Sequence, residues 1–145
     1  MTRSGDALAL KVAETLLARE GTGPALGIEI ETVREGYARV AMMVRADMLN
    51  GHRIAHGGFI FILADTAFAY ACNSRNQAAV AQQISISFLR PAALGERLIA
   101  EARETAVVGR SGSYHLSVRK DNGEIIAEAI GVSRLKGSAV IHSDS

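Results

Sequence analysis

The sequence predicts an α+β domain in which an antiparallel sheet encloses one long apolar helix. Three observations support this fold class. Residues 58–73 are apolar on nearly every side of a helix, several other segments alternate between apolar and polar residues, and short turns join these segments. Hairpin-length connections favour antiparallel pairing, and a helix that lacks a polar face has to be covered by the sheet.

The composition is that of one globular domain, expected to span residues 1–145. The chain is 48% hydrophobic and 21% charged, with two prolines. Its 16 basic and 15 acidic residues leave a net charge of +1 and form no basic tract, which argues against nucleic-acid binding. Neither a signal peptide nor a membrane span is expected. The single cysteine, Cys72, is interpreted as a core residue and fits a reducing, cytoplasmic compartment.

The first expected element is a helix over residues 6–19, with Asp6 as its N-cap. Leu8, Val12 and Leu16 recur every four residues and predict its buried face. The sequence GTGPALG then ends the helical pattern, and its glycine spacing does not match a dinucleotide-binding loop.

Two strands are expected next. Residues 26–33, LGIEIETV, alternate as a half-buried strand does, and residues 37–44 repeat the pattern after a turn at Glu35-Gly36. The first of these strands begins the core of the domain, expected over about 26–135, and a tail follows over about 137–145.

The central apolar segment is too long for a typical strand and is rich in Ala and Leu, so we expect a buried helix. Four further strands then complete the sheet. The first, AQQISISFLRP, places Ile84, Ile86 and Phe88 on one face. The sequence DNG at 121–123 predicts a hairpin before the last strand, EIIAEAIGVSRL.

The start of the central helix has features that point to chemistry. Gly57 and Gly58 leave backbone N–H groups open to a ligand, and such donors suit an anion or a developing oxyanion. Alternatively, the glycines only make a tight turn into the helix. Asp65 favours a functional interpretation, because a carboxylate among apolar residues needs a partner or a role. Alternatively, Asp65 has only a structural role, as a carboxylate that forms a hydrogen bond with a neighbouring loop or with Thr66.

Asp65 and the two glycines are too far apart along one helix to form a single active site within one chain. Seven residues separate Asp65 from Gly58, so the two share a helix face but lie about 10 Å apart along the axis. A base and an oxyanion donor both have to lie about 3 Å from one carbonyl. Two antiparallel copies of the helix, one from each subunit, meet both demands and predict a homodimer with two composite sites.

The loop before the helix, MLNGHRIAHGG, contributes further polar residues. Asn50 either makes a turn with Gly51 or directs its amide at a water or a substrate carbonyl near Asp65. His52 and His56 have HxxxH spacing, but the flanking glycines argue against a helix and no third ligand is apparent, so no metal is expected. His56 is expected to position the loop or to polarise a carbonyl.

These segments resemble the hot-dog-fold acyl-CoA thioesterases of the phenylacetate-degradation (PaaI) type. The resemblance rests on MLNGHRIAHGGFIFILADTAFAYACNS and ISFLRPAALGERLIAEA and extends over about 26–135. Its motif is N-G-H-x(3)-H-G-G-x(6)-D, with R-P-x(3)-G downstream. It implies that the sheet wraps the long helix, that dimers join their sheets edge to edge, and that dimers pair into homotetramers.

The resemblance further implies hydrolysis of an acyl-CoA thioester without metal or cofactor, typically of arylacetyl groups such as hydroxyphenylacetyl. The family's acidic residue falls on Asp65, as nucleophile or general base, and its backbone oxyanion donor falls on Gly57 or Gly58. Its supporting polar residues fall on Asn50 and His56. The remaining substrate-binding candidates are His52 in the loop and Phe61 and Phe68, one turn on either side of Asp65.

For CoA, the resemblance points to Arg90, Pro91 and the turn of Gly109, Arg110 and Ser111, where the two arginines would meet phosphates. Arg110 as a solvated turn residue is the alternative. Ser111 is not expected to be a nucleophile, because GRSGS does not match the nucleophile elbow.

The chain departs from the family pattern at Ala81, where many relatives have Ser or Thr. Either Gln82 or Gln83 replaces that hydroxyl, or the rate or substrate preference differs. Three alternative functions stay open: a CoA-ester-binding module without turnover, a thioesterase for medium-chain aliphatic acyl-CoA, and a hydratase or dehydratase on the same fold. The last usually needs a differently placed His–Asp or Glu–His pair, which the sequence does not offer.

Overall fold

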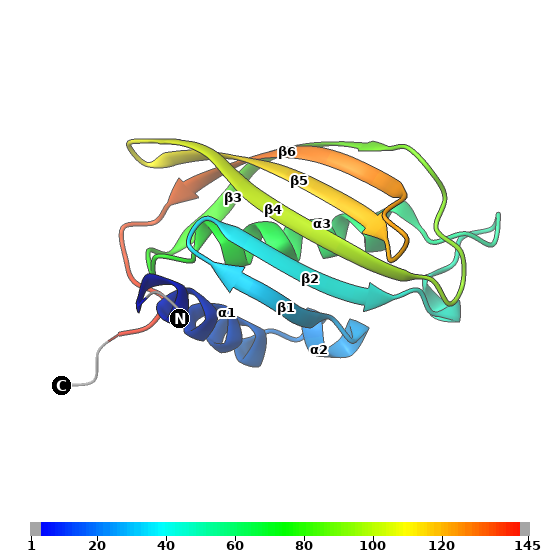
Figure 1. Ribbon diagram of the computed structural model, residues 1–145, viewed down its shortest axis with the longest axis horizontal. Helices are drawn as coiled ribbons and strands as arrows, with labels where there is room; N and C mark the ends of the chain where they lie inside the picture. The colour runs from blue at the N-terminus through cyan, green and yellow to red at the C-terminus, as the bar shows by residue number, and fades with distance from the viewer. Residues whose placement is uncertain (1–3, 143–145) are drawn as a thin grey trace.

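The computed structural model describes residues 4–142 and confirms the α+β class. A long and a short helix precede the sheet, and a second long helix comes between its second and third strands in the chain (Figure 1). The elements are α1 Ser4–Arg19, α2 Thr22–Leu26, β1 Glu29–Arg34, β2 Tyr37–Met43, the 3-10 turn η1 Ala46–Met48, α3 Gly57–Cys72, β3 Ala79–Phe88, β4 Arg97–Val108, β5 Ser111–Lys120 and β6 Ile125–Leu135.

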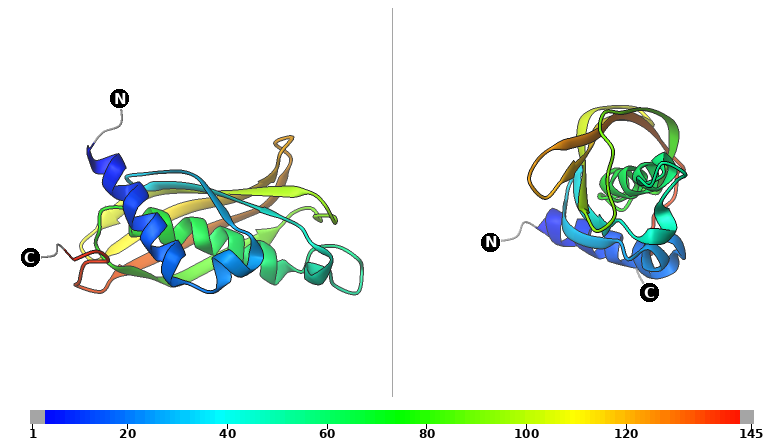
Figure 2. Two further views of the ribbon diagram at one scale, coloured as in Figure 1. Left: turned by 90° about the horizontal axis from the view of Figure 1, so that it is seen from below. Right: turned by 90° about the vertical axis from the view of Figure 1, so that its right-hand side faces the viewer.

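The six strands form one antiparallel sheet in the order β1-β2-β4-β5-β6-β3. Viewed from one end, the sheet curls around α3, while α1 and α2 lie outside it near β1 (Figure 2). This is the hot-dog arrangement that the resemblance implied. The strands at its two edges are β1 and β3, and α1 packs against β1.

The core lies between α3 and the concave face of the sheet. Leu63 and Ala67 of α3 and Leu98 of β4 are fully buried, and Phe68 packs its ring against Tyr114 with centroids 5.3 Å apart. Each large apolar side chain buried in this way stabilises the fold by about 1.5–3 kcal/mol. The interpretation of Cys72 as a core residue is confirmed, since its side chain is buried at the end of α3.

Helix α3 and edge strand β3 lie side by side and run in opposite directions. At one end, the Phe88 ring is so close to Gly57 that a Cβ there would lie 3.1 Å from it. At the other end, Asn73 donates to the carbonyls of Ala69 (2.8 Å) and Ala79 (3.1 Å) and accepts from the Ala79 N–H (2.9 Å). The Asn73 amide therefore fastens the end of α3 to the start of β3.

At the N-terminal end, one expectation was wrong and another was right only in part. Asp6 does not cap α1, which already includes Ser4; its Oδ1 instead accepts from the Glu35 N–H at 3.2 Å. The buried face of α1 is centred on Ala9, Val12 and Ala13. Val12 is therefore buried as predicted and Leu16 packs against the core, but Leu8 is 38% exposed.

The first strand also begins later than expected. Leu26 ends the short helix α2, which Gly27 closes with a φ of +69°, so β1 starts only at Glu29. The alternation of apolar residues continues across this helix end because Leu26 and Ile28 both pack into the core. The pattern alone therefore does not separate the two elements.

The later expectations hold. The central helix begins one residue earlier than predicted, and Asp121-Asn122-Gly123 makes the hairpin between β5 and β6, with Gly123 at a φ of +90°.

After β6, the tail is held by Asn76, whose side chain forms hydrogen bonds with the backbone of Val140 and Ile141. Residues 143–145 of the expected tail lie outside the described residues. Within 4–142, no helix combines the length and the apolar character needed to cross a bilayer.

Candidate active site

The N-terminus of α3 presents free backbone donors. His56 occupies the N-cap position in an extended conformation (φ −60°, ψ 136°) and makes no side-chain capping bond. Within the described part of the chain, nothing accepts a hydrogen bond from the N–H of Gly57 or Gly58. A Cβ on Gly58 would meet no atom within 4 Å, so this backbone is open to a ligand. Such donors suit a developing negative charge on oxygen.

The loop before α3 is shaped by Asn50. Its Oδ1 accepts from the backbone N–H of His52 (2.9 Å) and Ile54 (3.4 Å), so the expected turn is present. Its Nδ2 makes no hydrogen bond with any residue from 4 to 142 and is the group left for a ligand. Because this remaining group is a donor, Asn50 suits a carbonyl oxygen.

A cavity of about 430 Å³ lies beside this helix start. It brings together four of the predicted site residues, Asn50, Gly57, Arg90 and Pro91. The rest of its wall is largely apolar and comes from the loop, from α3 and from the end of β3: Ile54, Ala55, Ile60, Phe88 and Leu89.

Asp65 lies half-buried on α3 and makes no hydrogen bond within the described residues. The Thr66 hydroxyl donates to the Ile62 carbonyl at 2.7 Å, so the structural alternative of an Asp65–Thr66 bond is wrong. Burial raises the pKa of Asp65, and the nearby negative charge of Glu20 raises it further. An unbonded carboxylate with a raised pKa in an apolar helix is typical of a functional group.

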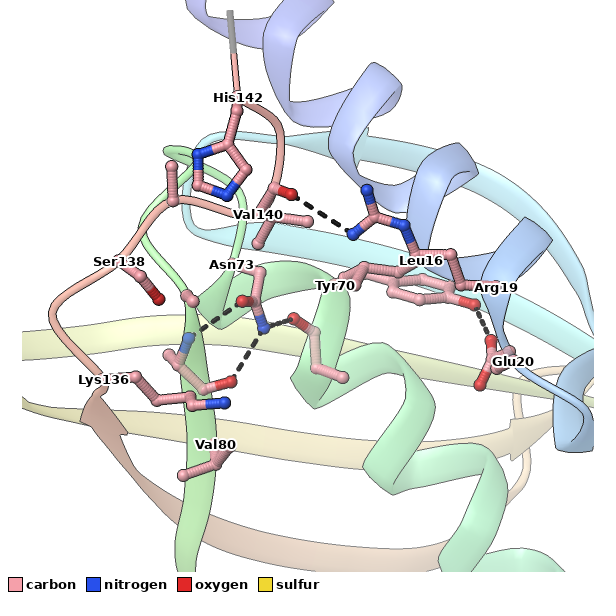
Figure 3. A pocket seen from close by; sticks show the side chains of 14 residues that line it. Leu16, Arg19, Glu20, Tyr70, Asn73, Val80, Lys136, Ser138, Val140 and His142 are labelled. Atoms are coloured by element: carbon pink, nitrogen blue, oxygen red, sulfur yellow. Dashed lines mark hydrogen bonds between the residues drawn. The ribbon is translucent and has the colours of Figure 1, made fainter.

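A second cavity, of about 670 Å³, lies near the C-terminal end of α3 (Figure 3). Its walls come from the end of α1, from α3, from the start of β3 and from the tail. The Tyr70 hydroxyl donates to a Glu20 oxygen at 2.5 Å inside it, and Arg19 donates to the Val140 carbonyl at 3.2 Å.

Several predicted residues lie elsewhere. Phe68 was expected to line the acyl pocket, but its ring faces the sheet against Tyr114 and Gly131 and belongs to the core. The sequence pattern did not reveal this, because Phe68 is one turn from Asp65 but is rotated from it by about 60° around α3, which is enough to direct its ring at the sheet. Phe61 is half-buried, and His52 and His56 are exposed.

The residues predicted to bind CoA lie at two opposite ends of the sheet. Arg90 is already paired, with Glu124 at 3.1 Å and the Ile125 carbonyl at 3.4 Å. Gly109, at a φ of +60°, turns β4 into β5, and Arg110 and Ser111 border a small cavity next to Cys72. This hairpin lies at the end of the sheet opposite Gly57, so one chain does not bring it to the first cavity.

The sequence reasoning missed several lining residues. Phe88 and Leu89 directly precede Arg90, and their position next to the R-P motif was a usable signal. Glu20 and Tyr70 gave no comparable signal, since fifty positions separate them and only the fold makes them neighbours.

Comparisons with known proteins show the family of this chain. A model described as the thioesterase superfamily matches residues 52–127. The acyl-coenzyme A thioesterase PaaI of Escherichia coli (strain K12) is 41% identical over 128 residues, which cover 88% of this chain and 91% of the relative. The chain belongs to the thioesterase superfamily. This thioesterase is a thioester hydrolase of the PaaI type.

Solved structures support the same assignment. The E. coli PaaI protein superposes on the thioesterase with a TM-score of 0.92 at 40% identity, covering 94% of this chain and 99% of that one. The protein smu.793 of Streptococcus mutans UA159, solved bound to acetyl CoA, gives a TM-score of 0.74 at 25% identity, covering 77% and 90%.

Proposed function

We propose that this thioesterase hydrolyses an acyl-CoA to the free acid and CoA, with an arylacetyl group as the acyl part. The acyl-CoA assignment is supported by the activity in the name of the E. coli relative and by the acetyl CoA bound to the S. mutans protein. The largely apolar wall of the first cavity suits an acyl group or the arm of CoA. The arylacetyl group is an inference from the PaaI-type relationship.

The N–H of Gly58 acts as the oxyanion donor in this proposal. It is free, and the space in front of it is open. The thioester carbonyl oxygen points at this donor, and the Asn50 Nδ2 supports the same oxygen. Gly57 has a different task, because its missing side chain leaves room for the Phe88 ring.

Asp65 promotes the attack on the carbonyl carbon in one of two ways. As a general base it takes a proton from water while the water oxygen bonds to the carbonyl carbon; as a nucleophile its own oxygen forms that bond, and water then cleaves the anhydride. In both routes the carbon–sulfur bond breaks, the sulfur leaves with the bonding electrons, and the thiolate takes up a proton as free CoA.

A second copy of the chain completes the site. Asp65 lies about 10 Å along α3 from Gly58, too far for both to reach one carbonyl in one chain. Strand β3 is at the edge of the sheet, so no other strand among residues 4–142 pairs with its outer side. The side chains of Val80 and Phe88 on this strand are each about half exposed. An open strand edge of this kind is a template for pairing with another strand, because its outward backbone N–H and C=O groups have no partner in the described chain. Antiparallel β3–β3 pairing reverses one α3 against the other, so Asp65 of each chain approaches Gly58 of its partner.

The observation that carries the proposal is the unbonded Asp65 carboxylate on the same helix as a free, open Gly58 N–H. The test is release of CoA thiol from a panel of arylacetyl- and aliphatic acyl-CoAs. We expect Asp65→Asn to lower kcat by at least about 10²-fold, the typical contribution of a general base, while the fold is retained. Near-wild-type turnover by Asp65→Asn contradicts the role of Asp65. Binding of the esters without any thiol release by the wild type favours the binding module instead.

A further inference from the structure

The second cavity contains one acidic group at the end formed by α1. Glu20 follows the last residue of α1, and its carboxylate accepts the Tyr70 hydroxyl through Oε1 at 2.5 Å. Figure 3 shows Glu20 and Tyr70 on one side of the cavity and Lys136, Ser138 and His142 on the other. Within residues 4–142, no group donates a hydrogen bond to the Oε2 of Glu20. This oxygen is therefore available to a ligand.

The other polar groups that reach into this cavity are occupied or lie at its rim. Asn73 uses its amide to join α3 to β3. Arg19 donates to the Val140 carbonyl, while Lys136 and His142 are exposed. Apolar side chains such as Leu16, Ala69 and Val80 make up much of the remaining wall. The cavity thus combines a largely apolar wall and one carboxylate acceptor with an exposed polar rim of Lys136, Ser138 and His142.

The position of this carboxylate relative to Asp65 suits the far end of an acyl group. Ala69, which lines the cavity, follows Asp65 by one helical turn on the same face. Tyr70, which holds Glu20, is five residues beyond Asp65, or about 7.5 Å along the helix axis. Besides burial, the charge of Glu20 raises the pKa of Asp65, so the two carboxylates are close enough to border one acyl-binding space.

The proposed dimer joins this cavity to the partner's oxyanion site. The second cavity is lined by Ala79 and Val80 at the start of β3, and the first by Phe88 and Leu89 at its end. Antiparallel pairing of two β3 strands places the start of one beside the end of the other. The second cavity of one chain then lies next to the first cavity of its partner. Asp65 itself lines neither cavity within one chain, but it lies on α3 between Ile60, which lines the first cavity, and Ala69, which lines the second.

We propose that the second cavity receives the acyl group and that Glu20 determines specificity there. Glu20 accepts a hydrogen bond from acyl groups that end in a hydroxyl, and its charge repels acyl groups that end in a carboxylate. This inference rests on the proposed acyl-CoA hydrolysis. It adds a residue that directly follows α1, outside the segments that carry the family motif, to the proposed substrate-binding surface.

The test measures kcat/KM for three ring-substituted arylacetyl-CoAs that carry a hydroxyl, a hydrogen or a carboxylate at the position farthest from the thioester. We expect Glu20→Gln to lower the hydroxyl-to-hydrogen ratio by about tenfold, because a charge-assisted hydrogen bond becomes a neutral one. The carboxylate-to-hydrogen ratio is expected to rise by about tenfold or more as the repulsion disappears. Glu14→Gln, at an exposed position of α1, is the matched control and leaves both ratios unchanged.

Tyr70→Phe gives an independent variant that keeps the ring and removes the hydroxyl that holds Glu20. We expect it to reduce the hydroxyl preference by a smaller factor and to leave the carboxylate disfavoured, because Glu20 keeps its charge. Unchanged ratios in Glu20→Gln overturn the inference. A uniform change of KM for all three esters also overturns it, since the cavity then holds the CoA arm. Failure of the wild type to hydrolyse any of the three contradicts the proposed function itself.

Discussion

At the scale of single residues, Gly58 allows the oxyanion donor to be tested without changing a side-chain contact. A Cβ at this position meets open space, and proline is tolerated in the first turn of a helix, where the N–H has no partner in the chain. Gly58→Ala keeps the N–H, whereas Gly58→Pro removes it. We expect Gly58→Pro to lower kcat by about 10²–10³-fold and Gly58→Ala to change it little.

The comparison depends on both variants being folded, which circular dichroism and thermal melting check. If Gly58→Ala loses as much activity as Gly58→Pro, the space in front of Gly58 matters and the N–H does not. If both retain activity, the oxyanion donor lies elsewhere.

Asp65 is expected to lower stability at the pH at which it works. Burial first, and the charge of Glu20 second, raise its pKa in the folded state above the value in the unfolded chain. Below the unfolded-state pKa the Asp65 side chain is neutral in both states and folding carries no penalty from its charge. As the pH rises through the folded-state pKa, the buried side chain becomes charged and this part of the stability is lost. We expect Asp65→Asn to have a higher melting temperature than the wild type at pH 7, although it is inactive.

This difference should shrink as the pH is lowered toward the ordinary range of an aspartate, about 4, where the wild-type side chain is also neutral. Asp47→Asn, at an exposed position, is the control and should show no such gain. A lower melting temperature for Asp65→Asn at pH 7 would contradict the pKa shift.

At the scale of elements, the junction of α3 and β3 depends on Asn73. Its side chain makes three hydrogen bonds to the backbone of Ala69 and Ala79 and is buried. Asn73→Ala leaves the Ala79 backbone groups without these partners in a buried place. We expect it to lower the free energy of unfolding by about 2–4 kcal/mol in urea denaturation.

Asn122→Ala is the matched control, because Asn122 also bonds a backbone N–H, that of Glu124, but in an exposed turn. We expect it to cost less than about 1 kcal/mol. Equal losses from the two variants would mean that burial of the Asn73 amide contributes nothing.

The elements that the sequence predicts well are those with a local physical signal. A helix without a polar face and the DNG turn are both determined by neighbouring residues, so α3 and the last hairpin were expected within one or two positions. The boundary of α2 and β1 was not, because Leu26 and Ile28 pack into the core from two different elements. Gly57, Gly58 and Asp65 stood out as residue types unusual for their surroundings. The Glu20–Tyr70 pair required the tertiary fold.

At the scale of the whole molecule, the composite site predicts that two inactive chains restore activity together. In a mixed dimer of Asp65→Asn and Gly58→Pro chains, one site combines the intact Asp65 of one chain with the intact Gly58 of the other. Random pairing makes half of the dimers mixed, each with one good site, so we expect about a quarter of the wild-type activity. The measurement is thiol release by the two co-expressed chains.

Each variant expressed alone provides the control for this experiment. If Asp65 and Gly58 served a site within one chain, every chain in the mixture would be defective and no activity would return. Analytical ultracentrifugation of the same samples reports whether the chains pair at all.

The burial of Cys72 has a consequence for an enzyme whose proposed product is a thiol. It is the one cysteine of the chain, and burial raises its pKa to about 12. A thiol of this kind is neither accessible nor ionised near neutral pH, so it exchanges poorly with disulfides. We therefore expect that the enzyme forms no mixed disulfide between Cys72 and its proposed product CoA, even when CoA accumulates under oxidising conditions.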